Sequence, residues 1–239
     1  MKLIPQYLII FLTLIMCSEV YAQKYKKPKN LPRYDKQKIH FGFTLGINAL
    51  DFNVKRNQSY INNDSLLTLY TKNQKGFNLG IVSNLRLGKY TDLRFIPTLV
   101  FGERILKYNF LNENNTEDII KESKRIESTL IDFPIYLKYK SARYNNFRTY
   151  IISGIKYSLD IASQDEINDE GEEIVKLKKH DLMGEIGFGI DFYLEYFKFS
   201  PQIKISHGIL NLITREETIY TESIDRLTTN GWMFSLTFE

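Results

Sequence analysis

Eight charged side chains stand at alternate positions within otherwise apolar segments of this 239-residue chain. They are Arg86, Arg94, Lys138, Arg148, Lys156, Asp160, Glu185 and Asp191. Successive side chains of a β-strand point to opposite faces, so this spacing places the charges together on one face. Because both signs are present, the pattern predicts a buried network of ion pairs with a structural role.

Three histidines are the other candidates for chemistry, because imidazole can act as a general base near neutral pH. They are His40, His180 and His207. Asp181 follows His180 and Ser206 precedes His207, but neighbours in a strand point to opposite faces and cannot form a catalytic pair by adjacency. A pair across strands stays open as the alternative of a lipid enzyme. We expect no enzymatic activity, no cofactor and no metal site.

Six carboxylates gather in the polar segment 164–173. Their spacing lacks the pattern of an EF-hand, in which oxygen ligands recur at fixed positions of a 12-residue loop. We expect a solvated surface loop. Calcium binding, or bridging to lipopolysaccharide through divalent cations, is the alternative.

The elements that must position the charges are eight antiparallel strands, recognised by alternation of apolar with small or polar residues. They are predicted at residues 39–49 (extending toward 54), 76–87, 93–108, 126–140, 147–161, 181–193, 197–209 and 231–238. Long polar connections at 55–75, 112–124, 164–173 and 211–227 alternate with short turns. This rhythm is typical of an outer-membrane barrel with long outer loops and short periplasmic turns.

The distribution of charge favours a membrane barrel over a soluble sandwich, which is the alternative fold. An Arg or Lys on the lipid face near the midplane costs about 2–4 kcal/mol, and the eight charges lie on the opposite face. The 16 Phe and 16 Tyr suit aromatic girdles. We therefore predict an all-β, closed, eight-stranded transmembrane barrel whose narrow lumen is filled by side chains. Pro97, Pro134 and Pro201 interrupt strands and require local bulges.

The N-terminal 37 residues are predicted to lie outside the barrel. Residues 1–22 have the basic start, apolar run and small-residue end of a secretory signal peptide, with cleavage between Ala22 and Gln23. Lipidation at Cys17, the only cysteine, is the alternative. Residues 23–37 carry six Lys or Arg and two prolines, which predicts a disordered basic periplasmic tail. The barrel then covers residues 38–239.

Several segments together resemble the PorT (SprT) family of small outer-membrane barrels of Bacteroidota. They are HFGFTLGIN from His40, LRFIPTLVFGER from Leu93, IDFPIYLKYKS from Ile131, NNFRTYIISGIKYSLDIAS from Asn145 and DFYLEYFKFSP from Asp191. The resemblance covers nearly the whole mature chain and implies a component required for type IX protein secretion and gliding motility. It transfers no catalytic residues. Glu239 follows Phe238, whereas outer-membrane chains commonly end on an aromatic residue.

We accordingly expect an outer-membrane protein that is structural or assembly-related, with a small passive porin as the alternative. Its expected partners are outer-membrane lipid, lipopolysaccharide and other secretion proteins. The formal charge of +4 is too small to indicate nucleic acid, and no small-molecule substrate is expected.

Overall fold

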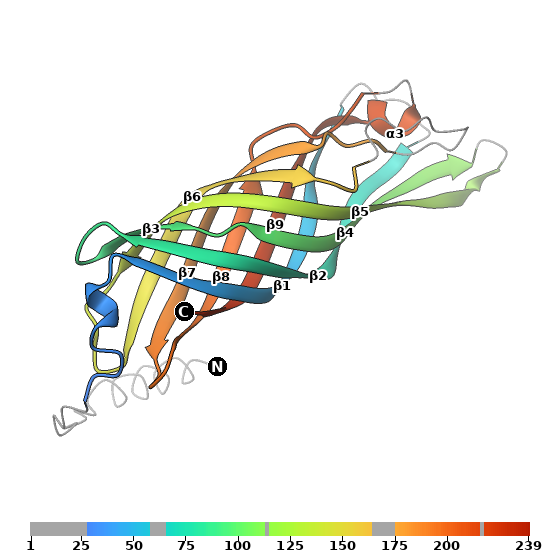
Figure 1. Cartoon of the computed structure of the whole chain (residues 1–239). Helices are drawn as coiled ribbons and strands as arrows, with labels where there is room; N and C mark the ends of the chain where they lie inside the picture. The colour runs from blue at the N-terminus through green and yellow to red at the C-terminus, as the bar shows by residue number, and fades with distance from the viewer. Residues whose placement is uncertain (1–27, 58–65, 113–114, 164–174, 216–217) are drawn as a thin grey trace, which may run out of the picture.

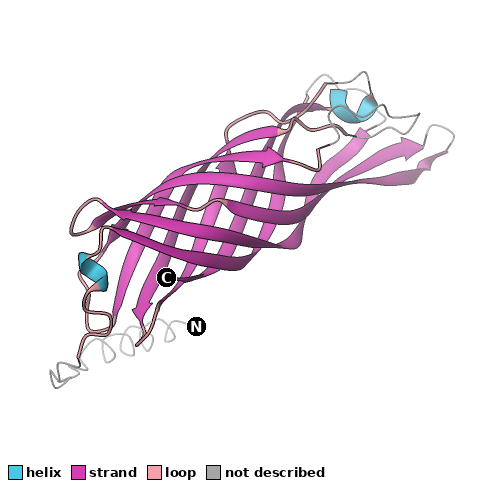
Figure 2. Cartoon of the chain, in the orientation of Figure 1, coloured by secondary structure: helices cyan, strands magenta, loops and turns pink. Residues whose placement is uncertain are grey.

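Nine strands form one antiparallel sheet that closes on itself in the computed structural model (Figures 1 and 2). The structure describes residues 28–57, 66–112, 115–163, 175–215 and 218–239. The elements are η1 (Tyr34–Lys36), β1 (Ile39–Arg56), β2 (Leu66–Arg86), β3 (Thr91–Phe95), β4 (Thr98–Asn112), β5 (Asn115–Lys140), β6 (Phe147–Asp160), β7 (His180–Tyr193), β8 (Lys198–Gly208), α3 (Ile219–Glu222) and β9 (Ile224–Phe238). Among these described residues, no helix has the length and apolar character needed to cross a membrane.

The first and last strands close the ring. β1 pairs with β2 on one side and with β9 on the other, from Phe43 opposite Phe238 to Arg56 opposite Ile224. Both β3 and β4 lie between β2 and β5, so they are two parts of one interrupted strand. The ring therefore has eight positions, and the prediction of a closed eight-stranded barrel is confirmed.

Two of the strand prolines lie where β3 gives way to β4. Pro97 falls in the two-residue break, and Pro134 of β5 lies across from it, between the paired residues Phe95–Ile135 and Thr98–Asp132. Proline lacks an N–H, so it is tolerated where the ladder is already interrupted. The carbonyl of Pro97 still accepts a hydrogen bond from the Ile81 N–H at 3.0 Å.

The two faces of the wall differ as the alternation predicts. Large apolar side chains are exposed on the outside, among them Phe41 (69% exposed), Ile81, Ile155, Ile186 and Ile205. The inner face carries buried polar and charged groups instead. A face that exposes this much apolar surface is suited to lipid, because burying it there removes it from water.

Two polar segments predicted to be loops are largely strands, and those predictions are wrong. The part of segment 55–75 from residue 66 onward extends β2, and most of segment 112–124 forms the ends of β4 and β5. These ends pair with each other from Gly102–Ser128 as far as Leu111–Ile119, and Figure 1 shows the hairpin continuing past the rest of the wall. Backbone hydrogen bonding continues there without a lipid-facing side, so the apolar alternation that identified the strands is lost. The acidic segment 164–173 lies outside the described residues.

An apolar cluster fills the outer end of the lumen. It combines inward side chains of the strands with side chains from the outer connections and α3. Its buried members are Phe52, Leu69, Leu106, Tyr108, Val175, Leu177, Leu212, Ile213, Tyr220, Ile224 and Leu227. The outer connections thus fold back as a cap on the barrel.

The prediction of a disordered tail over residues 23–37 is wrong for residues 28–37, which include η1 and lie against the opposite mouth, the one predicted to face the periplasm and named the periplasmic mouth below. Asn30 donates to the carbonyl of Tyr193 at 3.0 Å, and its N–H donates to the Asn146 side chain at 3.0 Å. The ring of Tyr34 stacks on His40 with centroids 3.8 Å apart. These specific contacts order a segment whose composition alone indicates disorder. Residues 1–27, with the predicted cleavage site at Ala22 and Gln23, lie outside the described part.

Candidate functional site in the lumen and at its periplasmic mouth

The middle of the lumen holds a compact group of ion pairs built from four strands. Lys156 of β6 lies 3.1 Å from Asp132 of β5 and 2.8 Å from Glu185 of β7. Lys204 of β8 approaches Glu185 at 3.8 Å and donates to the Tyr136 hydroxyl at 2.9 Å. Tyr136 in turn donates to Glu185. All of these side chains are buried, so each charge depends on its partners rather than on water.

A second group lies toward the periplasmic end. Both oxygens of Asp191 accept hydrogen bonds from Lys138, at 2.8 and 2.9 Å, and Lys138 lies 3.5 Å from the centre of the Tyr150 ring. Glu239 forms ion pairs with Arg94 and with Lys198, the latter at 2.7 Å. Glu239 follows β9 with the same parity as Ser235 and Thr237, so its carboxylate enters the lumen. This placement gives a physical reason for an acidic residue after the aromatic Phe238.

The pKa of Glu239, which lies outside the strands, is lowered overall. Burial raises it, but the opposing effect of the cations Arg94, Lys198 and Lys138 is larger in sum. The side chain is fully buried and remains ionised because three cations surround it. It therefore ties β9 to β3 and β8 across the mouth of the barrel.

The structure places the eight predicted charges on the inner side, but not all in one network. Lys138, Lys156, Glu185 and Asp191 belong to the two groups above. Asp160 instead faces Arg104 at 3.7 Å near the outer end. Arg94, Arg148 and Arg86 reach partners outside the predicted set: Glu239, Asp35 and backbone carbonyls, respectively.

Several partners were missed by sequence reasoning. Arg104, Asp132 and Glu239 share the strand parity of the predicted charges, so the alternation that found the others could have found them. Asp92 pairs with Lys140 at 2.6 Å close to a turn, where parity is harder to extend. Asp35 lies outside the strands, so the alternation of side chains could not have identified it.

The mouth is organised around the carboxylate of Asp35. It forms ion pairs with Arg143, at 3.3 Å, and with Arg148, and it accepts a hydrogen bond from the Tyr193 hydroxyl at 3.3 Å. Burial raises the pKa of Asp35, but the two guanidinium groups outweigh burial and hold that pKa below its usual value. The arrangement is a carboxylate-binding fork, because planar guanidinium groups match carboxylate oxygens.

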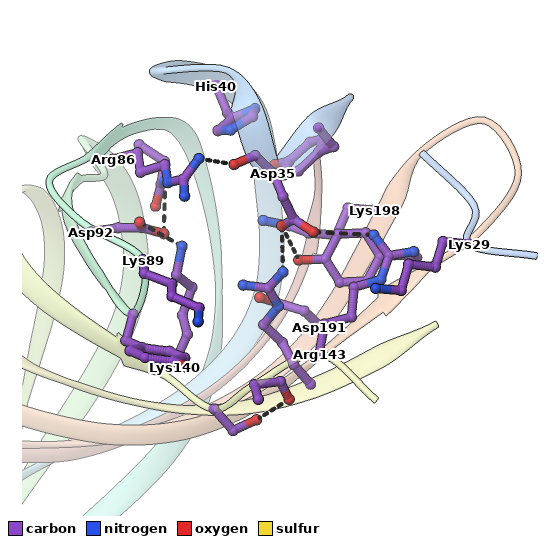
Figure 3. A pocket seen from close by; sticks show the side chains of 17 residues that line it. Lys29, Asp35, His40, Arg86, Lys89, Asp92, Lys140, Arg143, Asp191 and Lys198 are labelled. Atoms are coloured by element: carbon purple, nitrogen blue, oxygen red, sulfur yellow. Dashed lines mark hydrogen bonds and ion pairs between the residues drawn. The ribbon is translucent and has the colours of Figure 1, made fainter. Parts of the chain in front are cut away.

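Beside this fork lies a cavity of about 350 Å³ (Figure 3). Its walls come from the 28–37 segment, the turn before β3, the connection between β5 and β6, and the ends of β7 and β8. Such a volume is within the usual range for small-ligand sites, about 300–1,000 Å³. Its charged lining is predominantly basic.

The histidines are not gathered into one site. The Nδ1 atom of His180 lies 2.7 Å from the Tyr157 hydroxyl, and that of His207 lies 2.6 Å from the Asn230 side chain. His40 stacks on Tyr34 at the other end of the barrel. Within the described ranges, no group of three or more His, Cys, Asp or Glu residues could hold a metal ion.

Comparison with known proteins identifies the fold family. The family described as "Outer membrane protein beta-barrel domain" matches residues 21–214. Similar solved structures include Neisserial surface protein A, with 10% identity, coverage of 84% of this chain and 98% of that chain, and a TM-score of 0.43. Another is OprG from Pseudomonas aeruginosa, with 13% identity, coverage of 84% and 92%, and a TM-score of 0.42. No curated protein matches significantly.

Proposed function

The chain belongs to the outer membrane protein beta-barrel domain family, and from this premise we propose that it is a non-conducting, non-enzymatic barrel serving protein secretion. Its place is the outer membrane. The proposed role is that of an assembly or accessory component of the type IX secretion system, which also supports gliding motility.

The observation that carries this proposal is the filling of the lumen at three levels. The apolar cap closes the outer end, the ion pairs around Glu185 fill the middle, and the Asp35 segment lies across the periplasmic mouth. An eight-stranded ring has an interior just wide enough for side chains. A barrel closed in this way is suited to holding partners at its two ends rather than to passing solutes.

The link to type IX secretion rests on the resemblance to the PorT family in strand segments spread over the chain. IDFPIYLKYKS from Ile131 and DFYLEYFKFSP from Asp191 contain Asp132, Lys138, Asp191 and Lys198, which take part in the lumen ion pairs. The segments of the resemblance therefore coincide with the residues that fill the barrel. This coincidence supports a shared, plugged architecture.

A clean deletion of the gene in its own host tests the proposal. We expect loss of type IX cargo from the medium, and loss of surface gliding where the host glides, with restoration by the intact gene. Normal cargo secretion in the deletion strain would contradict the proposed role.

A small passive porin is the second candidate, because membership of this family also fits such a role. Planar-bilayer recording of the purified protein separates the two. A steady ionic current that depends on protein insertion would support the porin and count against the filled lumen, whereas a plugged barrel leaves the bilayer silent.

Lipopolysaccharide is the proposed lipid partner at the outer face. On the extended strand ends, Lys72, Lys107, Lys121 and Arg125 line one shallow hollow together with Tyr70. The stacked and partly exposed pair Phe77 and Phe101 lies a few residues nearer the membrane on β2 and β4. Cations just above an aromatic belt are at the level where lipid phosphates would meet them.

A further inference from the structure

The periplasmic cavity beside Asp35 carries a large excess of positive charge. Seven Lys or Arg side chains line it, against three aspartates among the described residues. Figure 3 shows Arg86, Lys89 and Lys140 on one side of the view and Arg143 and Lys198 on the other. The cations therefore surround the cavity rather than forming one contact point.

Part of this charge is already compensated. Lys140 pairs with Asp92 at 2.6 Å, and Lys198 pairs with Glu239 at 2.7 Å. Asp191 is held from deeper in the lumen by Lys138 at 2.8 Å. Of these groups, Asp92, Lys140, Asp191 and Lys198 line the cavity.

Other cations on the same walls have no carboxylate partner within the described residues. The guanidinium of Arg86 donates only to the carbonyl oxygens of Gly88 and Asp35. Lys29 and Lys89 are exposed at the rim and form no ion pair there. Arg148 is paired with Asp35, but its buried Nε atom has no hydrogen-bond partner within the described residues. A buried unpaired donor is costly, so this wall is suited to an incoming acceptor.

Asp35 shows which acceptor the site recognises. One carboxylate is held by Arg143, Arg148 and the Tyr193 hydroxyl, and the Arg143 guanidinium lies 3.7 Å from the centre of the Tyr193 ring. This carboxylate belongs to the short segment 28–37, which is covalently continuous with the barrel at β1. It is therefore a tethered group occupying part of a larger anion-binding site.

We propose that this cavity is a docking site for an acidic peptide segment of a periplasmic partner protein, and that Asp35 competes with it from within the chain. A segment with several carboxylates can contact Arg86 and Lys89 on one side and the arginine fork on the other. Tyr90 lines the same cavity and is 37% exposed, so it offers ring surface to a peptide. The cations lie on both sides of the cavity, which favours a ligand with several separated anionic groups over a single phosphate ion. The proposal does not depend on the role in secretion, since it concerns binding alone.

Calorimetric titration of the purified chain in detergent micelles tests this, with the peptide acetyl-Asp-Glu-Asp-Glu-amide as the probe. The matched peptide acetyl-Asn-Gln-Asn-Gln-amide and inorganic pyrophosphate are the other two arms. We expect binding of the acidic peptide that weakens with added salt, and little binding of the neutral peptide. Equal binding of the two peptides, no binding of the acidic peptide, or tighter binding of pyrophosphate than of the acidic peptide would overturn the proposal.

Variants locate the site and test the competition. The double variant Arg86→Gln, Lys89→Gln should weaken binding of the acidic peptide about tenfold or more, because two charged contacts are lost. The control Lys72→Gln, Lys107→Gln removes two cations at the far end of the barrel and should leave the affinity unchanged. Asp35→Asn should strengthen binding, since it frees the arginine fork.

Heat-dependent gel mobility of each variant verifies that the barrel is folded. Unchanged binding in the Arg86, Lys89 variant would place the peptide elsewhere and overturn the assignment. Unchanged or weaker binding in Asp35→Asn would overturn the competition between Asp35 and the peptide.

Discussion

Replacing Glu239 by Gln should strongly destabilise the barrel although it changes a single charge after the last strand. The Arg94 and Glu239 side chains are both 0% exposed, and Lys198, at 3% exposure, shares the same carboxylate. The variant keeps the size of the side chain but leaves Arg94 in the lumen without its anionic partner. The Tyr34 hydroxyl, which donates to Glu239 at 2.7 Å, also loses a charged acceptor.

The size of the effect follows from the burial of the pair. Removing one partner of a buried ion pair costs about 3–5 kcal/mol, since the remaining charge stays desolvated. The amide of Gln can still accept one hydrogen bond, so we expect the lower end, about 3 kcal/mol. At about 1–3 kcal/mol per M of urea, this corresponds to a midpoint lower by about 1–3 M.

Reversible urea unfolding in lipid vesicles measures the midpoint, with the single tryptophan, Trp232, as the fluorescent probe on the outer face. Asp225→Asn is the matched control. Its ion pair with Lys55 has a similar distance, 2.9 Å, but the two side chains are 75% and 43% exposed, so the midpoint should hardly move. Equal midpoints for Glu239→Gln and the control would refute the reasoning that burial makes this pair important.

The same variant has a pH signature. The folded state lowers the pKa of Glu239 below its ordinary value of 4.5, so its stabilisation is fully present above that value. It is lost as the pH falls below 4.5 toward the folded-state pKa, because the unfolded chain then binds more protons. The difference in stability between the native chain and Glu239→Gln should therefore narrow in acid. A difference that stays constant through this range would show that the charge of Glu239 is not the cause.

Two further predictions concern the wall and the outer surface. Gly189→Ala should lower stability by about 1–3 kcal/mol in the urea assay, because the added Cβ would overlap the ring and hydroxyl of Tyr150. Gly184→Ala is the control: its Cβ would have nothing within 4 Å, so stability should change by no more than about 0.5 kcal/mol. The double variant Lys72→Gln, Lys107→Gln should reduce the amount of lipopolysaccharide that copurifies with each mole of barrel. The double variant Arg86→Gln, Lys89→Gln is the control and should not reduce it. Equal loss of lipopolysaccharide in both variants would contradict the proposed outer contact.

The alternation of side chains predicted the wall of the barrel because lipid and lumen impose opposite chemistry on neighbouring residues. It predicted that Lys138, Lys156, Glu185 and Asp191 face inward, since an error of one residue would have put them in lipid. The same alternation places the side chains of Glu239 and Arg104 on the inner face. It cannot say which cation meets which carboxylate, because partners such as Lys156 and Asp132 depend on the stagger between strands.

Where the outer face of a strand no longer meets lipid, alternation carries less information. The outer ends of β2, β4 and β5 therefore resemble loops in sequence although they remain paired strands, with two register shifts between β2 and β4. The segment around Asp35 resembles a disordered tail for a related reason. Its order comes from long-range partners, Arg143 and Arg148, that lie more than 100 residues away in the chain. Composition indicates how much surface a segment can bury by itself. This segment can bury little surface without those partners, so its order cannot be predicted from its composition.

The two closures of the lumen differ in chemistry, and the difference favours the periplasmic end as the exchangeable one. The outer cap is held by buried apolar side chains such as Leu106 and Leu227, both 0% exposed, and opening it would return their surface to water at about 25 cal/mol per Å². The inner closure is held by a half-buried carboxylate in an arginine fork. One carboxylate can replace another there and accept from the same donors, so exchange involves little net loss of hydrogen bonding. A barrel closed by apolar packing at one end and by exchangeable ion pairs at the other is suited to bind a partner at its periplasmic mouth.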